Sequence, residues 1–159
     1  MKLMINGVSM NCEDYMEYNL TLDQSVLDRY NKYYFTQHPK AKKIPIERPL
    51  HPSINSWMIL QRMAMNNLKQ KWKDMVVWWI NDLGYNDLKL DQFEMTVTSY
   101  MPTKRRADPD NIAPKFLCDG FTESGFIVDD DGEHLRSLTL RTRYDKNNPH
   151  TDINIKVLN

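Results

Sequence analysis

The sequence predicts a single mixed α/β (α+β) domain, in which helices pack against a mixed β-sheet. Its 159 residues fit one domain, and 41% of them are apolar, which is enough to build a core. Apolar residues recur at steps of three and four between Trp57 and Leu83, which is typical of a long amphipathic helix. Apolar and polar residues alternate between Leu90 and Tyr100, as expected for a strand with one buried face.

The segment before the long helix is expected to hold a strand, a short helix and a second strand. Residues 15–22 alternate in hydrophobicity, and Thr21 or Asp23 is a suitable N-cap for a short helix. Residues 43–50 (KIPIERPL) are predicted to form a strand at a sheet edge, because their prolines cannot donate ladder hydrogen bonds. We treat residues 1–42 as an N-terminal extension and residues 43–159 as the main domain.

The elements after the long helix can be placed by their turn residues. The long helix is expected to run unbroken to Gly84, a common residue just beyond a helix end. A second helix should begin near Asp110 or Asn111 and end at Gly125. Residues 135–144 and 152–158 alternate as strands, and the turn between them predicts a β-hairpin.

Composition excludes several classes of protein. No apolar run approaches the roughly 18 residues of a membrane span, and the N-terminal residues do not resemble a secretory signal. The two cysteines show no paired spacing, which favours a reduced cytoplasmic chain. The four histidines are scattered without ligand spacing, and the five glycines form no phosphate-binding loop.

The charges are balanced overall but unevenly distributed. Lys and Arg number 21, as do Asp and Glu, so net charge alone does not indicate nucleic-acid binding. The stretch from His38 to Lys73, however, contains eight Lys and Arg residues but only one acid, Glu47. Lys69 and Lys73 are predicted DNA contacts within this stretch. A solvated helix face with a polar loop would give the same pattern.

The segment 104-KRRADPDN-111 carries the clearest chemistry. Pro109 restricts Asp108 to extended geometry, so the carboxylates of Asp108 and Asp110 are expected to face one way. Oxygen ligands of this kind suit Mg²⁺, or Mn²⁺, rather than zinc. The preceding Lys104, Arg105 and Arg106 are predicted to bind phosphates. A pair of acids at a helix start is also a common N-cap, and that alternative stays open.

A second acidic cluster, Asp129 to Asp131, follows the predicted second helix. The two clusters can meet at one end of that helix if the chain doubles back after Gly125, which would join several carboxylates with Lys115. Carboxylates that hold Mg²⁺ beside basic groups favour phosphodiester cleavage, with Lys115 stabilising charge in the transition state. Lys115 also has the spacing for a surface ion pair with Asp119.

These motifs together resemble the core of the RusA family of Holliday-junction resolvases. The stretch 49-PLHPSIN-55 is similar to that family's entry into its long helix, and the resemblance covers residues 43–159. The family's acid, Asn, Lys and Gly positions are matched, in order, by Asp108, Asp110, Asn111, Lys115, Asp119, Gly125, Asp129 and Asp130. Three departures are visible: Ala107 stands where the family has a basic residue, residues 111–114 hold one extra residue, and residues 1–42 have no counterpart.

The resemblance implies a RusA-like fold and a homodimeric, Mg²⁺-dependent endonuclease that resolves four-way DNA junctions by paired nicks. Asp108, Asp110 and Asp130 would be the catalytic acids, with Asp129 beside them at the metal and Lys115 as the essential lysine. Asn111 and Asp119 would have structural roles. A phage or prophage protein in the cytoplasm of a bacterial cell, acting in recombination, repair or DNA processing, is the expected setting. The alternatives are a non-catalytic nucleic-acid-binding relative and a metal-dependent nucleotide-sugar transferase.

Overall fold

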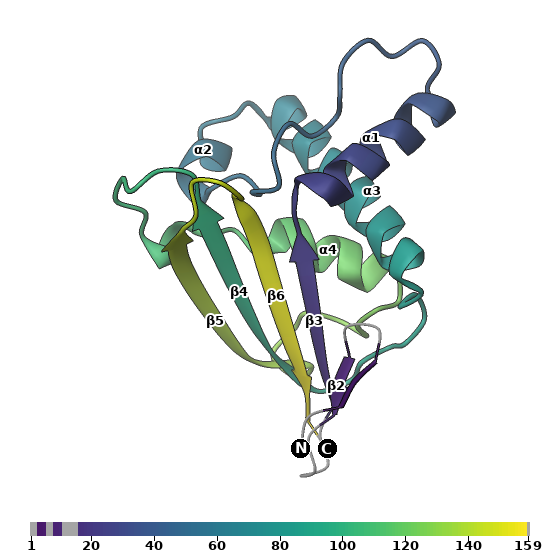
Figure 1. Ribbon diagram of the computed structural model, residues 1–159, viewed down its shortest axis with the longest axis vertical. Coiled ribbons are helices and arrows are strands. Elements are labelled where there is room, and N and C mark those ends of the chain that lie inside the picture. Colours follow the sequence, from purple (N-terminus) through teal and green to yellow (C-terminus); the bar gives the residue numbers. More distant parts are fainter. Residues whose placement is uncertain (1–2, 6–7, 11–15, 159) are drawn as a thin grey trace.

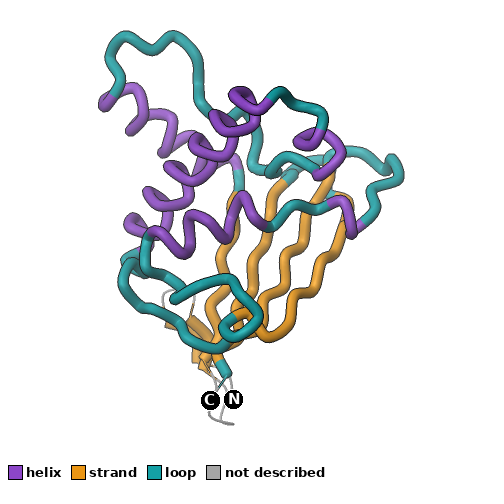
Figure 2. Tube along the Cα trace, turned by 180° about the vertical axis from the view of Figure 1, so that it is seen from behind, coloured by secondary structure: helices purple, strands orange, loops and turns teal. Residues whose placement is uncertain are grey.

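The computed structural model describes residues 3–5, 8–10 and 16–158, and it forms one mixed α/β domain. Six strands make one sheet in the order β1-β2-β3-β6-β4-β5. Helices α3 and α4 lie across one face of this sheet, and α1 packs on α3 (Figures 1 and 2). The elements are β1 (Leu3–Ile5), β2 (Val8–Met10), β3 (Met16–Leu22), α1 (Gln24–Gln37), α2 (Ile54–Met58), α3 (Arg62–Leu83), β4 (Phe93–Met101), the 3₁₀-helix η1 (Pro109–Asn111), α4 (Lys115–Glu123), β5 (Leu135–Tyr144) and β6 (His150–Val157).

The centre of the sheet shows that the predicted hairpin of the last two strands is wrong. β6 lies between β3 and β4 and is antiparallel to both, whereas β5 pairs in parallel with β4 at the outer edge. The side chains account for this order: Ile153 and Ile155 of β6 are buried, which suits a central strand, while most of β5 is exposed. The parallel β4–β5 pair needs a crossover connection, and α4 provides it.

The predicted long helix is interrupted. Ser53 caps α2, whose C-cap is Ile59, and α3 starts afresh after Gln61, which has an extended backbone. Neither Pro nor Gly occurs at the break. Instead, α2 is attached elsewhere, because the Asn55 N–H donates to Asn111 Oδ1 at 2.9 Å and Ser53 forms a β-bridge with Ile112. Helix α2 is thus a separate element anchored to a distant segment, which the periodicity of residues 57–83 does not indicate.

Residues 43–50 form no strand, so the edge strand predicted for this segment is wrong. Pro45 and Pro49 remove two backbone donors, and the segment crosses the surface as a loop. Two of its side chains, Ile46 and Leu50, are nevertheless buried. The Pro49 carbonyl accepts a hydrogen bond of 2.8 Å from Thr151 Oγ1, which ties the loop to the end of β6.

The range 16–42 contributes directly to the sheet and to the helical layer. β3 pairs with β6 from Glu17↔Lys156 to Leu22↔Thr151, as a strand predicted near residues 15–22 can do. The predicted cap is confirmed at Asp23, whose carboxylate accepts from the Val26 N–H at 3.1 Å. Leu27 of α1 is fully buried. Residues 1–42 were expected to be an N-terminal extension, and residues 1–2, 6–7 and 11–15 of this range lie outside the described residues.

Helices α3 and α4 pack closely, which fixes the position of α4 over the sheet. Trp79 and Ile80 of α3 and Phe121 of α4 are buried in one core with the inward-facing residues of β4 and β6. Gly120 lies directly against Val76, where a Cβ would come within 2.5 Å of the valine side chain. No helix in residues 16–158 or the two short described segments before them is long and apolar enough to cross a membrane.

Candidate functional site

The two acidic segments leave from opposite ends of the β4–β5 pair. Phe93 pairs with Leu135 at one end and Met101 with Tyr144 at the other, so the strands run side by side in parallel. Asp108 and Asp110 follow the carboxyl end of β4, whereas Asp129 and Asp130 precede the amino end of β5. At about 3.3 Å per residue, these strand ends are roughly 26 Å apart.

Asp108 lies in a cleft of about 200 Å³ at the carboxyl ends of β4 and β5. The Arg106 Nε donates to Asp108 Oδ1 at 3.0 Å, and both side chains are well exposed. This hydrogen bond, together with the charges of Asp108 and Asp110, raises the pKa of the Arg106 guanidinium. The cleft is lined by Arg48, Leu50, His51, Ser53, Ser99, Met101, Arg106, Ala107, Asp108, Asn111, Ile112 and Thr142.

Hydrogen bonds from neighbouring elements shape the loop that carries these acids. The Thr142 hydroxyl of β5 donates to the Ala107 carbonyl at 2.9 Å. On the other side, Asn111 Oδ1 accepts from the Asn55 N–H, so α2 is tied to the 3₁₀-helix η1. Asp110 belongs to η1 and is exposed. The loop is therefore fixed at both ends while its carboxylates face solvent.

Lys115 and Lys69 meet on the Trp57 indole, although they come from different helices. The Lys115 Nζ lies 5.0 Å from the centroid of the indole ring, and the Lys69 Nζ lies 4.9 Å from it. The pKa of Lys69 is lowered, first by desolvation and then by the nearby Lys115 charge, while Asp119 acts in the opposite direction. The structure thus brings two of the predicted cations together beside α2.

Asp129 and Asp130 lie near the middle of α4. The Asp130 N–H donates to Asp129 Oδ1 at 2.8 Å, and burial raises the pKa of the Asp130 carboxyl, with Asp129 and Asp119 adding to the shift. Burial also raises the pKa of the Cys118 thiol to about 12, with further contributions from Asp130 and Asp119. Asp119 is therefore within electrostatic range of both Lys69 and Asp130.

The predicted four-carboxylate metal site is not assembled in this structure. In the part of the chain that is described, no three His, Cys, Asp or Glu residues are grouped so that they could hold a metal ion. Asp108 and Asp110 still fit a hard cation, because they are exposed oxygen donors on one short, anchored loop. Mg²⁺ is often held by one or two carboxylates together with water and substrate phosphate. The metal ligation by Asp129 and Asp130 stays a prediction.

The remaining predicted cations are distributed around this surface. Lys104 Nζ lies 5.3 Å from the centroid of the Tyr144 ring, and Arg105 is exposed. Lys73 forms an ion pair of 3.4 Å with Glu123, which already offsets part of its charge. Of the five predicted DNA contacts, Lys73 and Arg106 therefore already have an acidic partner, Glu123 and Asp108 respectively.

Two titratable residues that line the Asp108 cleft, Arg48 and His51, were not among the site residues predicted from the sequence. Arg48 adds a second guanidinium to its lining. His51 is almost fully buried, and burial lowers its pKa to about 4, so the imidazole is neutral at pH 7. Its Nε2 has no hydrogen-bond partner within the described residues. The sequence feature that could have indicated His51 as a cleft residue is its position in the stretch 49-PLHPSIN-55.

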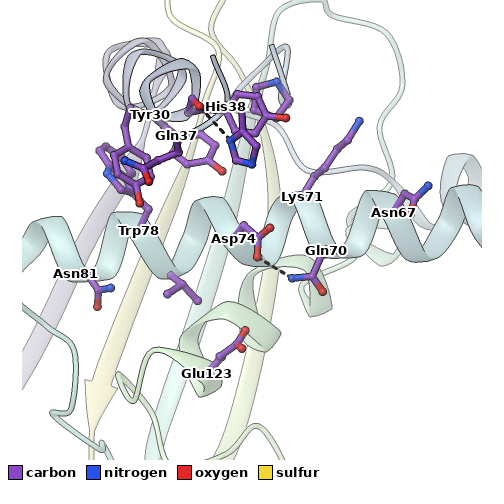
Figure 3. Close-up of a pocket in the computed structure, with 14 residues that line it drawn as sticks. Tyr30, Gln37, His38, Asn67, Gln70, Lys71, Asp74, Trp78, Asn81 and Glu123 are labelled. Atoms are coloured by element: carbon purple, nitrogen blue, oxygen red, sulfur yellow. Dashed lines mark hydrogen bonds between the residues drawn. The ribbon is translucent and has the colours of Figure 1, made fainter. Parts of the chain in front are cut away.

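A second, separate cleft of about 750 Å³ lies between α1 and α3 (Figure 3). Tyr30 and Trp78 pack with ring centroids 5.3 Å apart on one side of it. Asp74 accepts from Gln70 Nε2 at 2.7 Å in the middle, and Glu123 lies below on α4 (Figure 3). Lys71 is the only lysine or arginine among the lining residues, against two acids. Because two acids and one lysine line this cleft, it is a poorer phosphate site than the surface around Asp108.

Comparison with known proteins leaves the sequence and the geometry to carry the functional argument. The chain matches no protein-family model, and no curated protein matches it.

Proposed function

We propose that this protein is a metal-dependent endonuclease that cleaves branched DNA, with the four-way junction as its preferred substrate. The observation that carries the proposal is the joining of two functional surfaces by α2. Asn55 of α2 holds Asn111 next to the Asp108–Asp110 carboxylates, and Trp57 of the same helix contacts Lys69 and Lys115. Carboxylates for a cation and cations for a phosphate thus share one surface.

The residues would divide the chemistry between them. Asp108 and Asp110 would hold Mg²⁺, which when bound supplies an activated water and stabilises charge on the scissile phosphate. Arg106 keeps the Asp108 carboxylate oriented through its hydrogen bond of 3.0 Å. Lys104 and Arg105 provide exposed charges for the flanking phosphates. Asp129 and Asp130 enter only as further ligands that the resemblance to the RusA family implies.

Paired nicks require two active sites related by symmetry, so we propose that a homodimer acts. The junction between α2 and α3 offers a surface for this, because Met58, Ile59 and Met63 are strongly exposed there. Exposed apolar side chains that adjoin one another are typical of interfaces. They lie next to Trp57 in the chain, which would bring the partner close to the phosphate-binding surface.

A cleavage assay tests the proposal directly. The protein is incubated with a synthetic four-way junction and, separately, with a linear duplex of the same sequence, in Mg²⁺, in Mn²⁺ and in EDTA. We expect symmetric nicks in the junction with either metal, slower cutting of the duplex, and none in EDTA. Binding without nicking in both metals would identify a non-catalytic binder instead. Hydrolysis of a nucleotide sugar, with the junction left intact, would favour the transferase.

We expect Lys115→Ala to reduce turnover far more than junction binding. A positioned cation that stabilises the transition state is worth about a hundredfold in rate, whereas one phosphate contact among many changes affinity only several-fold. Single-turnover cleavage and a gel-shift titration in Ca²⁺ measure the two effects on the same junction. Lys115→Arg, which keeps the charge, should recover part of the rate. An equal loss of rate and of affinity would make Lys115 a binding residue.

A further inference from the structure

Lys69 and Lys115 form an unusual pair, because two ammonium groups share one aromatic ring. Each Nζ lies about 5 Å from the centroid of the Trp57 indole, close enough for a cation–π contact. The two lysines also lie within interaction range of each other, and their repulsion contributes to the lowered pKa of Lys69. Burial is the largest cause of the lowered pKa of Lys69 and the Lys115 charge comes next, while Asp119 opposes them with a smaller effect.

One further donor and the start of helix α4 lie at the same place. The Trp57 Nε1 is buried and has no hydrogen-bond acceptor among the described residues. The Phe116 ring, which packs edge-on against Trp57 at 6.0 Å, holds the indole in this position. Lys115 is also the first residue of α4, and the N-cap residue Pro114 makes no side-chain capping bond. The partial positive charge of the helix start therefore adds to that of the lysines.

We propose that Lys69, Lys115 and the Trp57 indole form a binding site for a single phosphate oxyanion. An anion between the two ammonium groups removes their repulsion and accepts charge-assisted hydrogen bonds from both, beside the Trp57 ring that they share. A phosphate has enough oxygens to accept from both lysines at once. The binding of an anion here follows from the contacts alone, whereas its identity as a DNA backbone phosphodiester rests on the proposed function.

The site would hold the scissile phosphate, so that Lys115 can stabilise the charge that develops on it during cleavage. Trp57 and Asn55 belong to the same short helix, and Asn55 is bonded to Asn111 beside Asp110. A strand whose phosphate is held by Lys69 and Lys115 therefore passes the Asp108–Asp110 carboxylates. Lys69 is on this view a positioning residue, which holds the DNA backbone without taking part in the chemical step.

The test follows the indole N–H signal of Trp57 by nuclear magnetic resonance, in EDTA, so that cleavage is not needed. The chain has four tryptophans, and a Trp57→Phe variant assigns the signal. Thymidylyl-thymidine supplies a phosphodiester, inorganic phosphate the free anion, and sodium chloride of equal ionic strength the control. We expect saturable movement of the Trp57 signal with the dinucleotide, with inorganic phosphate also binding, and none beyond ionic strength with chloride.

The matched variants are Lys69→Gln and Lys71→Gln. Lys71 is exposed on the same helix but lines the aromatic cleft of Figure 3 instead. Lys69→Gln should weaken dinucleotide binding about tenfold, the loss of one charge-assisted contact, while Lys71→Gln leaves it unchanged. Unchanged Trp72 and Trp79 signals would show that both variants are folded.

Each outcome decides between the two proposals. No saturable shift of the Trp57 signal, or equal weakening by both variants, overturns the phosphate site even if the junction is cleaved. Saturable binding that depends on Lys69, in a protein that never nicks DNA, supports the site and removes the nuclease. Binding of inorganic phosphate but not of the dinucleotide keeps the anion site and contradicts its assignment to the DNA backbone.

Discussion

Replacing Asp110 by Asn is expected to reduce Mg²⁺-dependent cleavage of a four-way junction by about a hundredfold or more. The substitution keeps the shape of the side chain but removes a negative charge from the proposed metal ligand, and metal-based charge stabilisation is worth several kcal/mol. Asp110 is exposed in η1, so the fold should be unaffected. The rate is measured under single-turnover conditions, and junction affinity is measured in Ca²⁺ in parallel.

Asp28→Asn is the matched control, because Asp28 is an exposed acid on α1 that accepts a local hydrogen bond of 3.0 Å from Gln24. It should cut at the wild-type rate. Asp130→Asn is the informative companion, since Asp130 lies next to Asp129 and Asp119 rather than next to Asp110. We expect a smaller loss for Asp130→Asn than for Asp110→Asn. Wild-type cleavage by Asp110→Asn would show that the carboxylate pair holds no catalytic metal.

The sequence predicted those parts of the fold that depend on local periodicity and capping. Strand β5 has the bounds expected for it, residues 135–144, and Asp23 caps α1 as one of the two residues proposed for that role. These features depend on neighbours in the chain, which is why a pattern of four to ten residues contains them. The mixed α/β class follows from the same patterns.

Strand pairing and the interruption of the long helix could not be predicted in the same way. A hairpin of the last two strands assumes that neighbours in the chain pair, whereas the buried Ile153 and Ile155 place β6 between β3 and β4. The separate helix α2 is bonded through Asn55 to Asn111, which lies far along the chain. Both outcomes involve tertiary contacts, which periodicity does not encode.

The same limit applies to the candidate site. The sequence identified Asp108, Asp110 and Lys115, but the meeting of the acidic clusters depended on where β5 begins. Its parallel pairing with β4 sets the start of β5 beside Phe93, at the end of the sheet away from the Asp108 loop. The Lys69–Trp57–Lys115 contact joins three elements, so no spacing in the sequence indicates it.

Gly120→Ala is expected to destabilise the protein by about 1–3 kcal/mol, although alanine is the better helix former. A Cβ at position 120 would lie 2.5 Å from both Cβ and Cγ1 of Val76 and 3.3 Å from the Lys73 carbonyl. Because Cβ of Val76 is fixed to its backbone, a change of rotamer cannot relieve the clash. Helix α4 must move away from α3. Urea unfolding, followed by tryptophan fluorescence, measures the change.

Gly132→Ala provides the control, because nothing lies within 4 Å of a Cβ there and its backbone is not left-handed. It should change stability by no more than about 0.5 kcal/mol. Gly120→Ala should also affect function, since α4 begins with Lys115 while Lys69 belongs to α3. Separating the helices moves the two ammonium groups apart on Trp57, so a folded Gly120→Ala protein should bind phosphodiester more weakly. A variant as stable as wild type would contradict the close packing of α3 on α4, and with it the support that holds both lysines on one ring.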